Sequence, residues 1–345
     1  MSTLSVIATA TVLALLPTLL YAALIWWLDR HEKEPLPLLI VAFLWGAVPA
    51  IVLAIFLTNV AGIPLEALIA SPGVRKATEL AVVAPIIEEA VKAVILVLLF
   101  LVSRREFDNV LDGIVYGALV GLGFAFVENI LYLSATGMQV GTERMAQLWL
   151  LRAGLFGLNH SMFTAFTGGA LGYARSVRLG WQRGLVASLG LGVAMVLHGL
   201  HNTLVLMTGV LASNGRSSAL ALNTCLGAIL SDWGGLALIV VLALMSGARE
   251  ARILRETLWE EVALGHITQE EYETLASGRK RWNARWSTLF TAGFEKWRSL
   301  GEFFDLATEL AFRKHRMADG DARYQELCAR DIDSFRKRID AMRDA

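Results

Sequence analysis

The sequence contains little that would indicate a secreted, disulfide-bonded or metal-cluster protein. Its 345 residues include only two cysteines, Cys225 in a late apolar run and Cys328 near the C-terminus. They are too few and too differently placed for a disulfide framework, and no CxxC pair or histidine-rich tract is present. The N-terminus lacks the basic segment of a secretory signal, and its apolar run is too long for one. We therefore expect this first run to be retained as a membrane span.

The chain as a whole also lacks an excess of charge of either sign. Its 31 Lys and Arg residues balance 31 Asp and Glu residues, so the formal net charge is +0 and gives no indication of nucleic-acid binding. Charged residues make up only 18% of the chain, apolar residues make up 55%, and the mean hydropathy is +0.54. The apolar residues form long runs without the alternation of strands. This composition predicts an all-α polytopic membrane protein.

Seven apolar runs are each long enough for one spanning helix of about 20 residues. They lie at residues 4–28, 36–60, 77–102, 110–135, 148–173, 184–209 and 219–246. After Gly247 the chain changes character, because 18 of the 31 basic and 18 of the 31 acidic residues follow that position. We predict a membrane-embedded domain over residues 1–246 and a charged helical tail over residues 247–345.

The positions of the basic residues predict the orientation in the membrane. Cytoplasmic loops carry an excess of Lys and Arg, and this excess arises here if the N-terminus lies outside and the tail lies in the cytoplasm. The inner loops then hold Arg30, Lys33, Arg104, Arg105, Arg175, Arg178 and Arg183, and the outer loops hold Arg75, Lys76, Arg144 and Arg216. We expect an integral protein of the plasma (inner) membrane.

The third apolar run carries three ionisable residues near its middle, Glu88, Glu89 and Lys92. Each such group near the centre of a span costs about 2.5–3.5 kcal/mol on insertion. On a helix the Lys92 ammonium can reach either carboxylate, since it lies four residues from Glu88 and three from Glu89. An ion pair that only fixes helix packing needs one glutamate. The second carboxylate therefore favours a functional site, with the structural ion pair as the open alternative.

Three further runs place polar side chains at a similar depth. Glu128 lies in the outer half of the fourth run, His160 midway along the fifth, and His198 and Asn202 on one face of the sixth. His201 lies one residue off that face and ranks below His198. His160 taken alone is equally consistent with a hydrogen-bonded packing residue. The convergence of acid, imidazole and amide groups from four helices is what a buried site requires.

Two other patterns predict packing rather than chemistry. The fourth run has a small-residue face that lets a neighbouring helix approach closely, formed by Gly113, Gly117, Gly121 and Gly123. The tail has an aromatic stripe at helical spacing, formed by Trp282, Trp286, Phe290, Phe294, Trp297 and Phe304. This stripe indicates either an interfacial amphipathic helix or the core of a small helical domain.

Three motifs follow one another on separate predicted spans: Glu88-Glu89-x-x-Lys92, Phe124-x-x-x-Glu128-Asn129 and His198-x-x-x-Asn202. In this combination the sequence resembles the PrsW family of intramembrane proteases over about residues 4–209. The resemblance implies a protease, regarded as a metalloprotease, that cuts membrane-anchored proteins such as anti-sigma factors. Many relatives carry an aspartate where this chain has Asn202. This difference removes an anionic metal ligand and favours a role in oxyanion binding.

The reaction that the resemblance implies, peptide hydrolysis, needs a base, stabilisation of an oxyanion and a proton donor. We expect Glu88 to act as the general base beside Glu89, while Lys92 keeps one carboxylate of the pair ionised. We expect Asn202 to bind the oxyanion.

The cofactor prediction has two versions. In the first, a zinc ion held by Glu128, His160 and His198 polarises the water. No HExxH sequence is present, so this ion is inferred from residue types rather than from a spacing signature. In the second, no metal takes part, and Glu88 activates the water together with Glu128 or His198.

Two functions from other classes also fit an intramembrane Glu and His cluster. A proton- or ion-coupled transporter or channel uses such residues as a relay, although the sequence shows no inverted repeat and no matching pair of Gly/Pro-broken spans. A non-catalytic membrane adaptor would act through the tail. The sequence leaves both alternatives open, and it predicts a membrane-anchored protein substrate and the lipid bilayer as partners of the protease.

Overall fold

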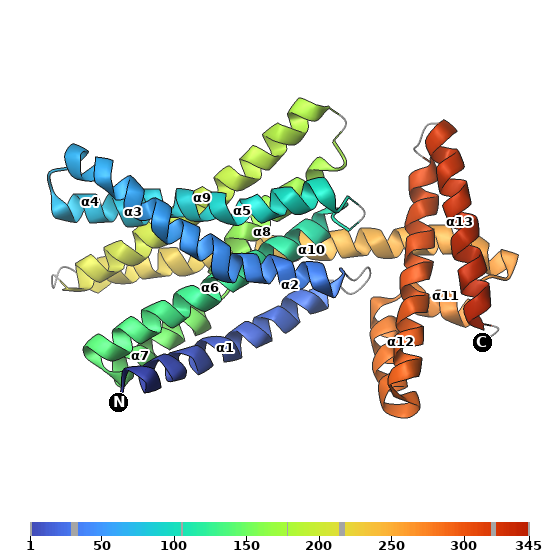
Figure 1. Cartoon of the computed structure of the whole chain (residues 1–345), viewed down its shortest axis with the longest axis horizontal. Coiled ribbons are helices and arrows are strands. Elements are labelled where there is room, and N and C mark those ends of the chain that lie inside the picture. The colour runs from blue at the N-terminus through green and yellow to red at the C-terminus, as the bar shows by residue number, and fades with distance from the viewer. Residues whose placement is uncertain are drawn as a thin grey trace. The chain divides into compact units, whose positions relative to one another are not determined.

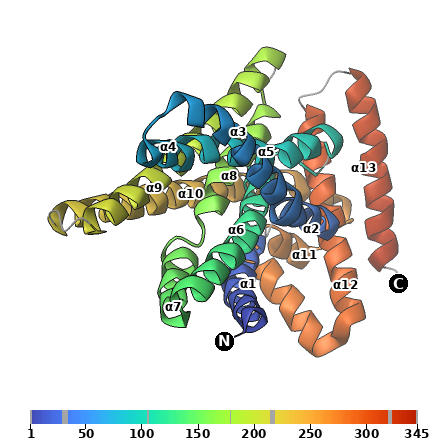
Figure 2. The ribbon, with the colours of Figure 1, turned by 60° about the vertical axis from the view of Figure 1, so that its left-hand side comes forward.

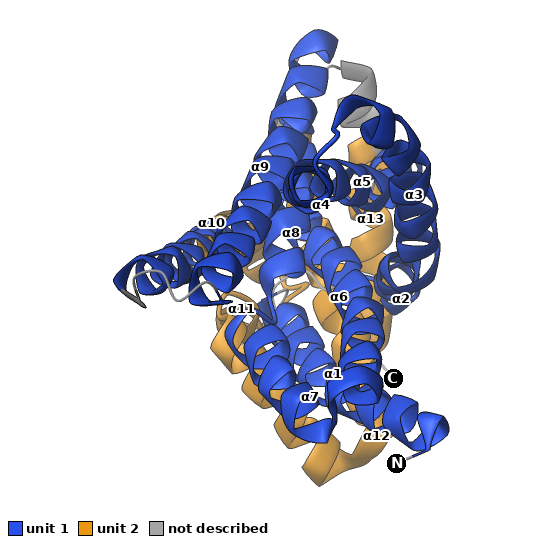
Figure 3. Cartoon of the chain, turned by 90° about the vertical axis from the view of Figure 1, so that its left-hand side faces the viewer, with its two compact units in different colours: residues 1–28, 34–243 blue, residues 29–33, 244–345 orange. Residues whose placement is uncertain are grey.

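The structure, a computed structural model, describes residues 2–28, 34–104, 106–177, 179–213, 218–318 and 322–343. Within these ranges every regular element is a helix and no strand occurs, which confirms the prediction of an all-α polytopic membrane protein. The chain forms two compact units, residues 1–28 with 34–243 and a second unit that includes residues 244–345 (Figure 3). Some basic residues used to predict orientation lie outside the described ranges, namely Arg30, Lys33, Arg105, Arg178 and Arg216.

The first unit is built from long apolar helices joined by short connections (Figure 1). These helices are α1 (Thr3–Leu28), α2 (Leu36–Trp45), α3 (Ile51–Leu68), α4 (Pro72–Thr78), α5 (Ala84–Val102), α6 (Val110–Val140), α7 (Thr142–Trp149), α8 (Asn159–Ala174), α9 (Gly180–Ser213) and the first part of α10 (Ser218–Leu264). π-Helical segments continue several of them, namely η1 (Gly46–Ala50), η2 (Glu79–Val83) and η3 (Leu150–Leu155).

Five helical stretches of the described residues are long and apolar enough to cross a bilayer: Thr3–Leu28, Leu36–Leu68, Val110–Val140, Gly180–Ser213 and Ala219–Leu264. The third and fifth apolar runs of the sequence are not among them. Helix α5 carries three ionisable residues within 19 residues, and α8 is only 16 residues long. The number of seven spans therefore stays a prediction.

Local sequence explains two of the helix boundaries. Asn109 caps α6, because its Oδ1 accepts hydrogen bonds from the backbone N–H groups of Leu111 and Asp112, and Asp112 Oδ2 accepts one in return from the Asn109 N–H. Pro49 lies within η1. Proline has no N–H to donate to the preceding turn, which favours the wider π-helical hydrogen bonding at this point.

Helix α6 is the central element of the first unit. Of the 18 consecutive residues that form its most apolar stretch, 83% are buried. It packs against α1, α2 and α8 (Figure 2). Three of the predicted glycines face α8. A Cβ atom at Gly117 would lie only 2.5 Å from the backbone oxygen of Thr164, and Gly113 and Gly121 contact the α8 backbone equally closely. The close approach of these helices brings the polar residues at the start of α8 next to those of α6.

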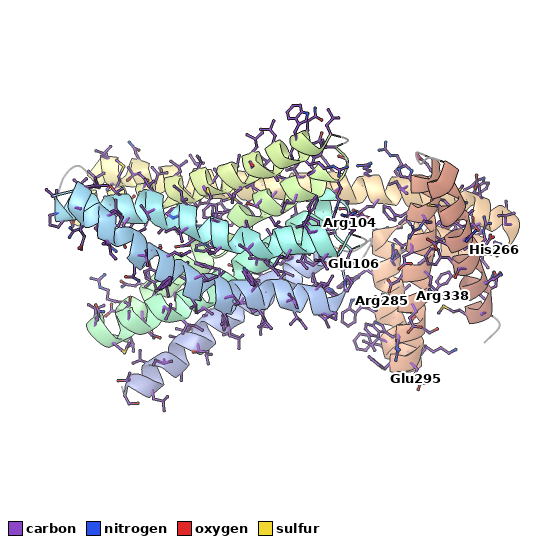
Figure 4. All side chains as sticks on the ribbon, turned by 45° about the horizontal axis from the view of Figure 1, so that its top comes forward. Arg104, Glu106, His266, Arg285, Glu295 and Arg338 are labelled. Atoms are coloured by element: carbon purple, nitrogen blue, oxygen red, sulfur yellow. The ribbon has the colours of Figure 1, made fainter. Side chains whose placement is uncertain are left out.

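The second unit contains the end of α10, α11 (Gln269–Leu275), α12 (Gly278–Ala318) and α13 (Ala322–Arg343). Its core includes Leu254, Leu258, Leu275, Phe304, Leu310 and Ile339. Helix α12 is bent at Gly293, whose φ of 85° suits glycine. Figure 4 shows the side chains of Arg285 and Glu295 on α12 and of Arg338 on α13.

The aromatic stripe of the tail is only partly buried. Phe304 is buried in the core of the second unit, as expected for a small helical domain. Phe290 and Phe294, which flank the bend at Gly293, are 80% and 65% exposed. They belong to rows of contacting rings, Trp286 with Phe290 and Phe294 with Trp297.

Candidate active site

The paired carboxylates of α5 have different surroundings. Lys92 Nζ donates to Glu89 Oε1 at 2.8 Å and lies 3.6 Å from Glu88 Oε2. The side chains of Glu89 and Lys92 are fully buried, whereas 14% of the Glu88 side chain is exposed. Thr164 of α8 donates a further hydrogen bond to Glu89 Oε2. Lys92 and Glu89 thus form a buried, hydrogen-bonded ion pair. Glu88 is the more distant and more exposed carboxylate of the two.

His198 of α9 lies between the two carboxylates. Its Nδ1 is 3.0 Å from Glu89 Oε1, and its Nε2 is 3.8 Å from Glu88 Oε2. The ring stacks on Phe163 of α8 with a centroid separation of 4.9 Å and an interplanar angle of 13°. A carboxylate at Nδ1 favours the tautomer that carries its proton there. The lone pair of Nε2 then faces Glu88.

His160 of α8 joins this group to the glutamate of α6. Its Nδ1 lies 3.0 Å from Lys92 Nζ, and its Nε2 lies 2.8 Å from Glu128 Oε2. Arg152 of η3 donates to Glu128 Oε2 at 2.5 Å and, through Nε, to Asn129 Oδ1 at 2.8 Å. Each of the two cations in this group therefore has one close carboxylate partner, buried Lys92 with Glu89 and half-buried Arg152 with Glu128.

Arg152 is the member of this network that the sequence analysis missed. The signal was present, because an arginine occurs within the apolar run 148–173 only a few residues before His160. A basic residue inside a span indicates a buried acidic partner. In the structure that partner is Glu128, one of the acids already predicted for the site.

The network opens onto a cavity of about 380 Å³. Residues from seven helical elements line it, and five of these elements supply the charged, imidazole and amide side chains: Glu88, Glu128, Asn129, Arg152, Asn159, His160, His198, His201 and Asn202. Glu89 and Lys92 are not among the lining residues, in agreement with their complete burial. The predicted convergence of Glu88, Glu128, His160, His198 and Asn202 on one volume is therefore present in the structure.

Asn202 faces this cavity with part of its hydrogen-bonding capacity already used. Its Nδ2 donates to the backbone oxygen of Leu80 at 2.9 Å. Leu80 belongs to η2, where the π-helical turn changes the local pairing of backbone groups. A carboxamide has two N–H donors, so Asn202 retains one besides the bond that holds η2.

The donor atoms of Glu88, His160 and His198 lie within 4.8 Å of one another. Glu88 Oε2 is buried and has no hydrogen-bond partner among the described residues. One carboxylate and two imidazoles are ligands that suit zinc, so these residues fit a divalent metal. Glu128, predicted as a ligand together with the two histidines, instead contacts Arg152 and His160, and its role as a ligand stays a prediction.

Residues 34–229 match the family model described as PrsW family intramembrane metalloprotease. The chain belongs to the PrsW family. This match confirms the resemblance seen in the three motifs, and it includes every predicted site residue from Glu88 to Asn202. Membership of a protease family also confirms the predicted enzyme class, an intramembrane protease, over the transporter and adaptor alternatives.

Proteins named Protease PrsW are similar to this PrsW-family chain. The one from Geobacillus kaustophilus is 35% identical over 178 residues, which cover 52% of this chain and 71% of that protein. The one from Clostridioides difficile is 36% identical over 141 residues, or 38% of this chain and 55% of that protein. The one from Bacillus subtilis is 36% identical over 120 residues, or 34% of this chain and 49% of that protein. No solved structure matches the chain.

Proposed function

We propose that this PrsW-family protein hydrolyses peptide bonds of membrane-anchored proteins in the cavity that Glu88 lines, with Glu88 as the general base. The observation that carries the proposal is the difference within the carboxylate pair. Glu89 is neutralised by Lys92 at 2.8 Å, whereas Glu88 Oε2 is buried without a hydrogen-bond partner in the described part of the chain. A carboxylate that is free to accept a proton beside a cavity suits a base that acts on water.

The reaction begins with a water molecule that donates a proton to Glu88 while its oxygen attacks the scissile carbonyl carbon. His198 orients this water through the Nε2 lone pair that faces Glu88. The developing oxyanion accepts a hydrogen bond from the N–H of Asn202 that Leu80 does not use. Collapse of the tetrahedral intermediate then breaks the C–N bond and requires a proton on the leaving nitrogen.

Metal assistance forms part of the proposal, because the family is described as metalloproteases and the donor set fits. His160 and His198 would hold the ion together with Glu128, whose Oε2 lies 2.8 Å from His160 Nε2. Glu88, whose donor atom lies within 4.8 Å of those of both histidines, would remain the base. When bound, zinc supplies Lewis-acid polarisation of water and carbonyl oxygen. Both nitrogens of His160 already have partners, Lys92 and Glu128, so metal binding there requires one of these contacts to open.

We further propose that residues 1–246 carry the protease and that residues 247–345 lie in the cytoplasm. The first part of this proposal is supported by the location of all site residues within the first compact unit. The second is supported by the bias of basic residues toward the inner loops. Membrane-anchored regulators such as anti-sigma factors are the substrate class that we propose, and the bilayer is the medium in which they reach the cavity.

The test compares the full-length protein with Glu88→Gln, Glu128→Gln and His198→Ala, each purified in detergent. Zinc content and cleavage of a quenched transmembrane reporter are measured on the same samples. We expect Glu88→Gln to lower cleavage by at least about 100-fold. Full zinc occupancy in inactive Glu88→Gln assigns Glu88 as the base, whereas loss of zinc assigns it as a ligand. Undiminished cleavage by Glu88→Gln would overturn the proposal.

A further inference from the structure

A second acid and imidazole pair lies in the first unit, apart from the carboxylates of α5. Asp232 of α10 is 3% exposed, and its Oδ2 lies 2.7 Å from His201 Nδ1. The other carboxylate oxygen, Oδ1, is buried and has no hydrogen-bond partner among the described residues. Asp232 lies beyond the residues 34–229 that match the family model. A buried acid within an apolar helix is a functional candidate.

His201 connects this pair to the active-site cavity, since it lines the same cavity as Glu88. Only 15% of its side chain is exposed, and its ring packs against Phe156 at a right-angled contact of 5.0 Å. Because Nδ1–H donates its hydrogen bond to Asp232, Nε2 is the nitrogen that remains for chemistry. Asn159 Nδ2 lies against the same ring, 3.2 Å from Nδ1 and 3.3 Å from Nε2. The sequence left open whether His201 faces the site, and the structure places it on the cavity wall.

Asp232 also lines a second, smaller cavity of about 60 Å³. Asn159 lines both cavities, and Tyr21 of α1 and Gly157 line the smaller one with Asp232. This volume accommodates water, and the polar atoms of Asp232 and Asn159 provide partners for it. A tether that only joined α9 to α10 would not need a histidine on the wall of the active-site cavity.

We propose that His201 is the catalytic acid that protonates the leaving amine and that Asp232 is the residue that positions it and stabilises its charged form. The imidazolium Nε2–H gives its proton to the amine nitrogen as the C–N bond breaks. The proton that Glu88 took from water returns to His201 through water in the cavity, so each turnover consumes one water and leaves both groups as they began. An aspartate at Nδ1 supports an imidazole in this way without being protonated itself.

The groups around His201 are consistent with this division of roles. Its own partner on α10 is Asp232. The other ionisable groups that line the cavity are Glu88 of α5, Glu128 and Tyr132 of α6, Arg152 of η3, His160 of α8 and His198 of α9. Arg152 and Glu128 form an ion pair with each other. His201 is thus the cavity histidine whose carboxylate partner is separate from the Glu88, Glu89 and Glu128 group.

The test varies the leaving group, because a general acid is needed for an amide but not for a thiolate, which leaves without protonation. A transmembrane reporter is made with either the ordinary peptide bond or a thioester at the cleaved position. Full-length wild type, His201→Gln and Asp232→Asn are compared in detergent, and thermal unfolding of each variant is recorded. Asp232→Asn is included because it leaves the His201 imidazole in place and keeps the volume of the side chain at position 232.

We expect His201→Gln to lower amide cleavage by at least about 100-fold while thioester cleavage stays close to that of wild type. Asp232→Asn is expected to lower amide cleavage in the same selective way. Equal losses on both substrates, or no loss on either, would overturn the assignment of His201 as the acid. The inference rests on the proposed hydrolysis, and Glu88→Gln tests that hydrolysis separately. If Glu88 acts on water, this variant must lose cleavage of both the amide and the thioester reporter, whatever the result for His201.

Discussion

Glu89 Oε1 lies 3.0 Å from His198 Nδ1 and 2.8 Å from Lys92 Nζ, so a single carboxylate oxygen of α5 contacts both Lys92 of the same helix and His198 of α9. Glu89 is fully buried, and its second oxygen accepts a hydrogen bond from Thr164 of α8. Adjacent glutamates in the sequence therefore have separate tasks. Glu89 fixes the position of Lys92 and His198. With His198 held in this way, its Nε2 atom faces Glu88.

This division predicts opposite behaviour of two matched substitutions. Glu89→Gln leaves the buried Lys92 ammonium without its close carboxylate, and breaking a buried ion pair costs about 3–5 kcal/mol. We expect a clear fall in thermal stability together with loss of cleavage. Glu88→Gln removes a carboxylate whose Oε2 accepts no hydrogen bond in the described residues and lies 3.6 Å from Lys92 Nζ, compared with 2.8 Å for Glu89 Oε1. Cleavage should therefore be lost with a smaller fall in stability. Thermal unfolding in detergent measures the stability of both variants. Equal destabilisation by Glu88→Gln and Glu89→Gln would contradict this division of roles between the two glutamates.

The location of the candidate site was predictable from the sequence because charge is costly in an apolar helix. Glu88, Lys92 and Glu128 stand out against apolar neighbours, and the helical repeat correctly places Lys92 within reach of both glutamates. The glycines of the fourth run likewise predict the close packing of α6 on another helix.

The pairing of side chains between helices was not predictable in the same way. Helical periodicity gives the face on which a residue lies but not the rotation of one helix against another. For this reason the link between Arg152 and Glu128, and the link between His201 and Asp232, appear only in the folded chain. Continuous apolar runs also hide π-helical segments such as η2, which depend on tertiary contacts such as that of Asn202 with Leu80.

Packing of α6 against α8 gives a prediction that does not involve the polar groups. A Cβ at Gly117 would lie 2.5 Å from Thr164 O, so Gly117→Ala forces the helices apart and should destabilise the protein by about 1–3 kcal/mol. Gly192 of α9 is the control, because a Cβ there meets nothing within 4 Å. Gly192→Ala should be neutral or stabilising by up to about 1 kcal/mol. The stability of both variants is measured by thermal unfolding in detergent. Equal changes in stability for Gly117→Ala and Gly192→Ala would contradict the packing argument.

Arg152 should matter through its geometry as well as its charge. It contacts Glu128 through Nη2 and Asn129 through Nε, and a lysine cannot reproduce two contacts from one planar group. We therefore expect Arg152→Lys to lower reporter cleavage, and Arg152→Gln to lower both cleavage and stability because Glu128 loses its arginine partner and keeps only His160.

A double-mutant cycle tests that relationship between Arg152 and Glu128. The combined Arg152→Gln and Glu128→Gln variant should be less destabilised than the sum of the single variants, since it leaves no unpaired charge. Additive unfolding free energies, measured by denaturant titration in detergent, would show that the contact does not couple the two residues. Cleavage is not the readout of this cycle, because Glu128 itself lines the active-site cavity.

The last prediction concerns the pH dependence of the second unit, where Glu261 of α10 is fully buried. Burial opposes its ionisation, but hydrogen bonds from Arg336 and Lys314 outweigh that effect and hold the pKa of Glu261 below its ordinary value of 4.5. A carboxylate whose pKa is lowered by folding adds stability above the unfolded pKa and loses it as the pH falls through the folded value. The second unit should therefore lose stability below about pH 4.5.

Hydrogen exchange of the full-length protein in nanodiscs measures this local stability through the backbone amides around Leu258, Leu310 and Ile339, which are buried in the core of the second unit. Glu261→Gln should lower their protection at neutral pH by about 3 kcal/mol, because Lys314 and Arg336 then lose a buried partner. The same variant should also show less dependence on pH than wild type. Glu273→Gln is the control, since that carboxylate pairs with Lys280 at the exposed surface, where ion pairs contribute little. Equal pH dependence in wild type and Glu261→Gln would mean that another group controls the acid sensitivity of this unit.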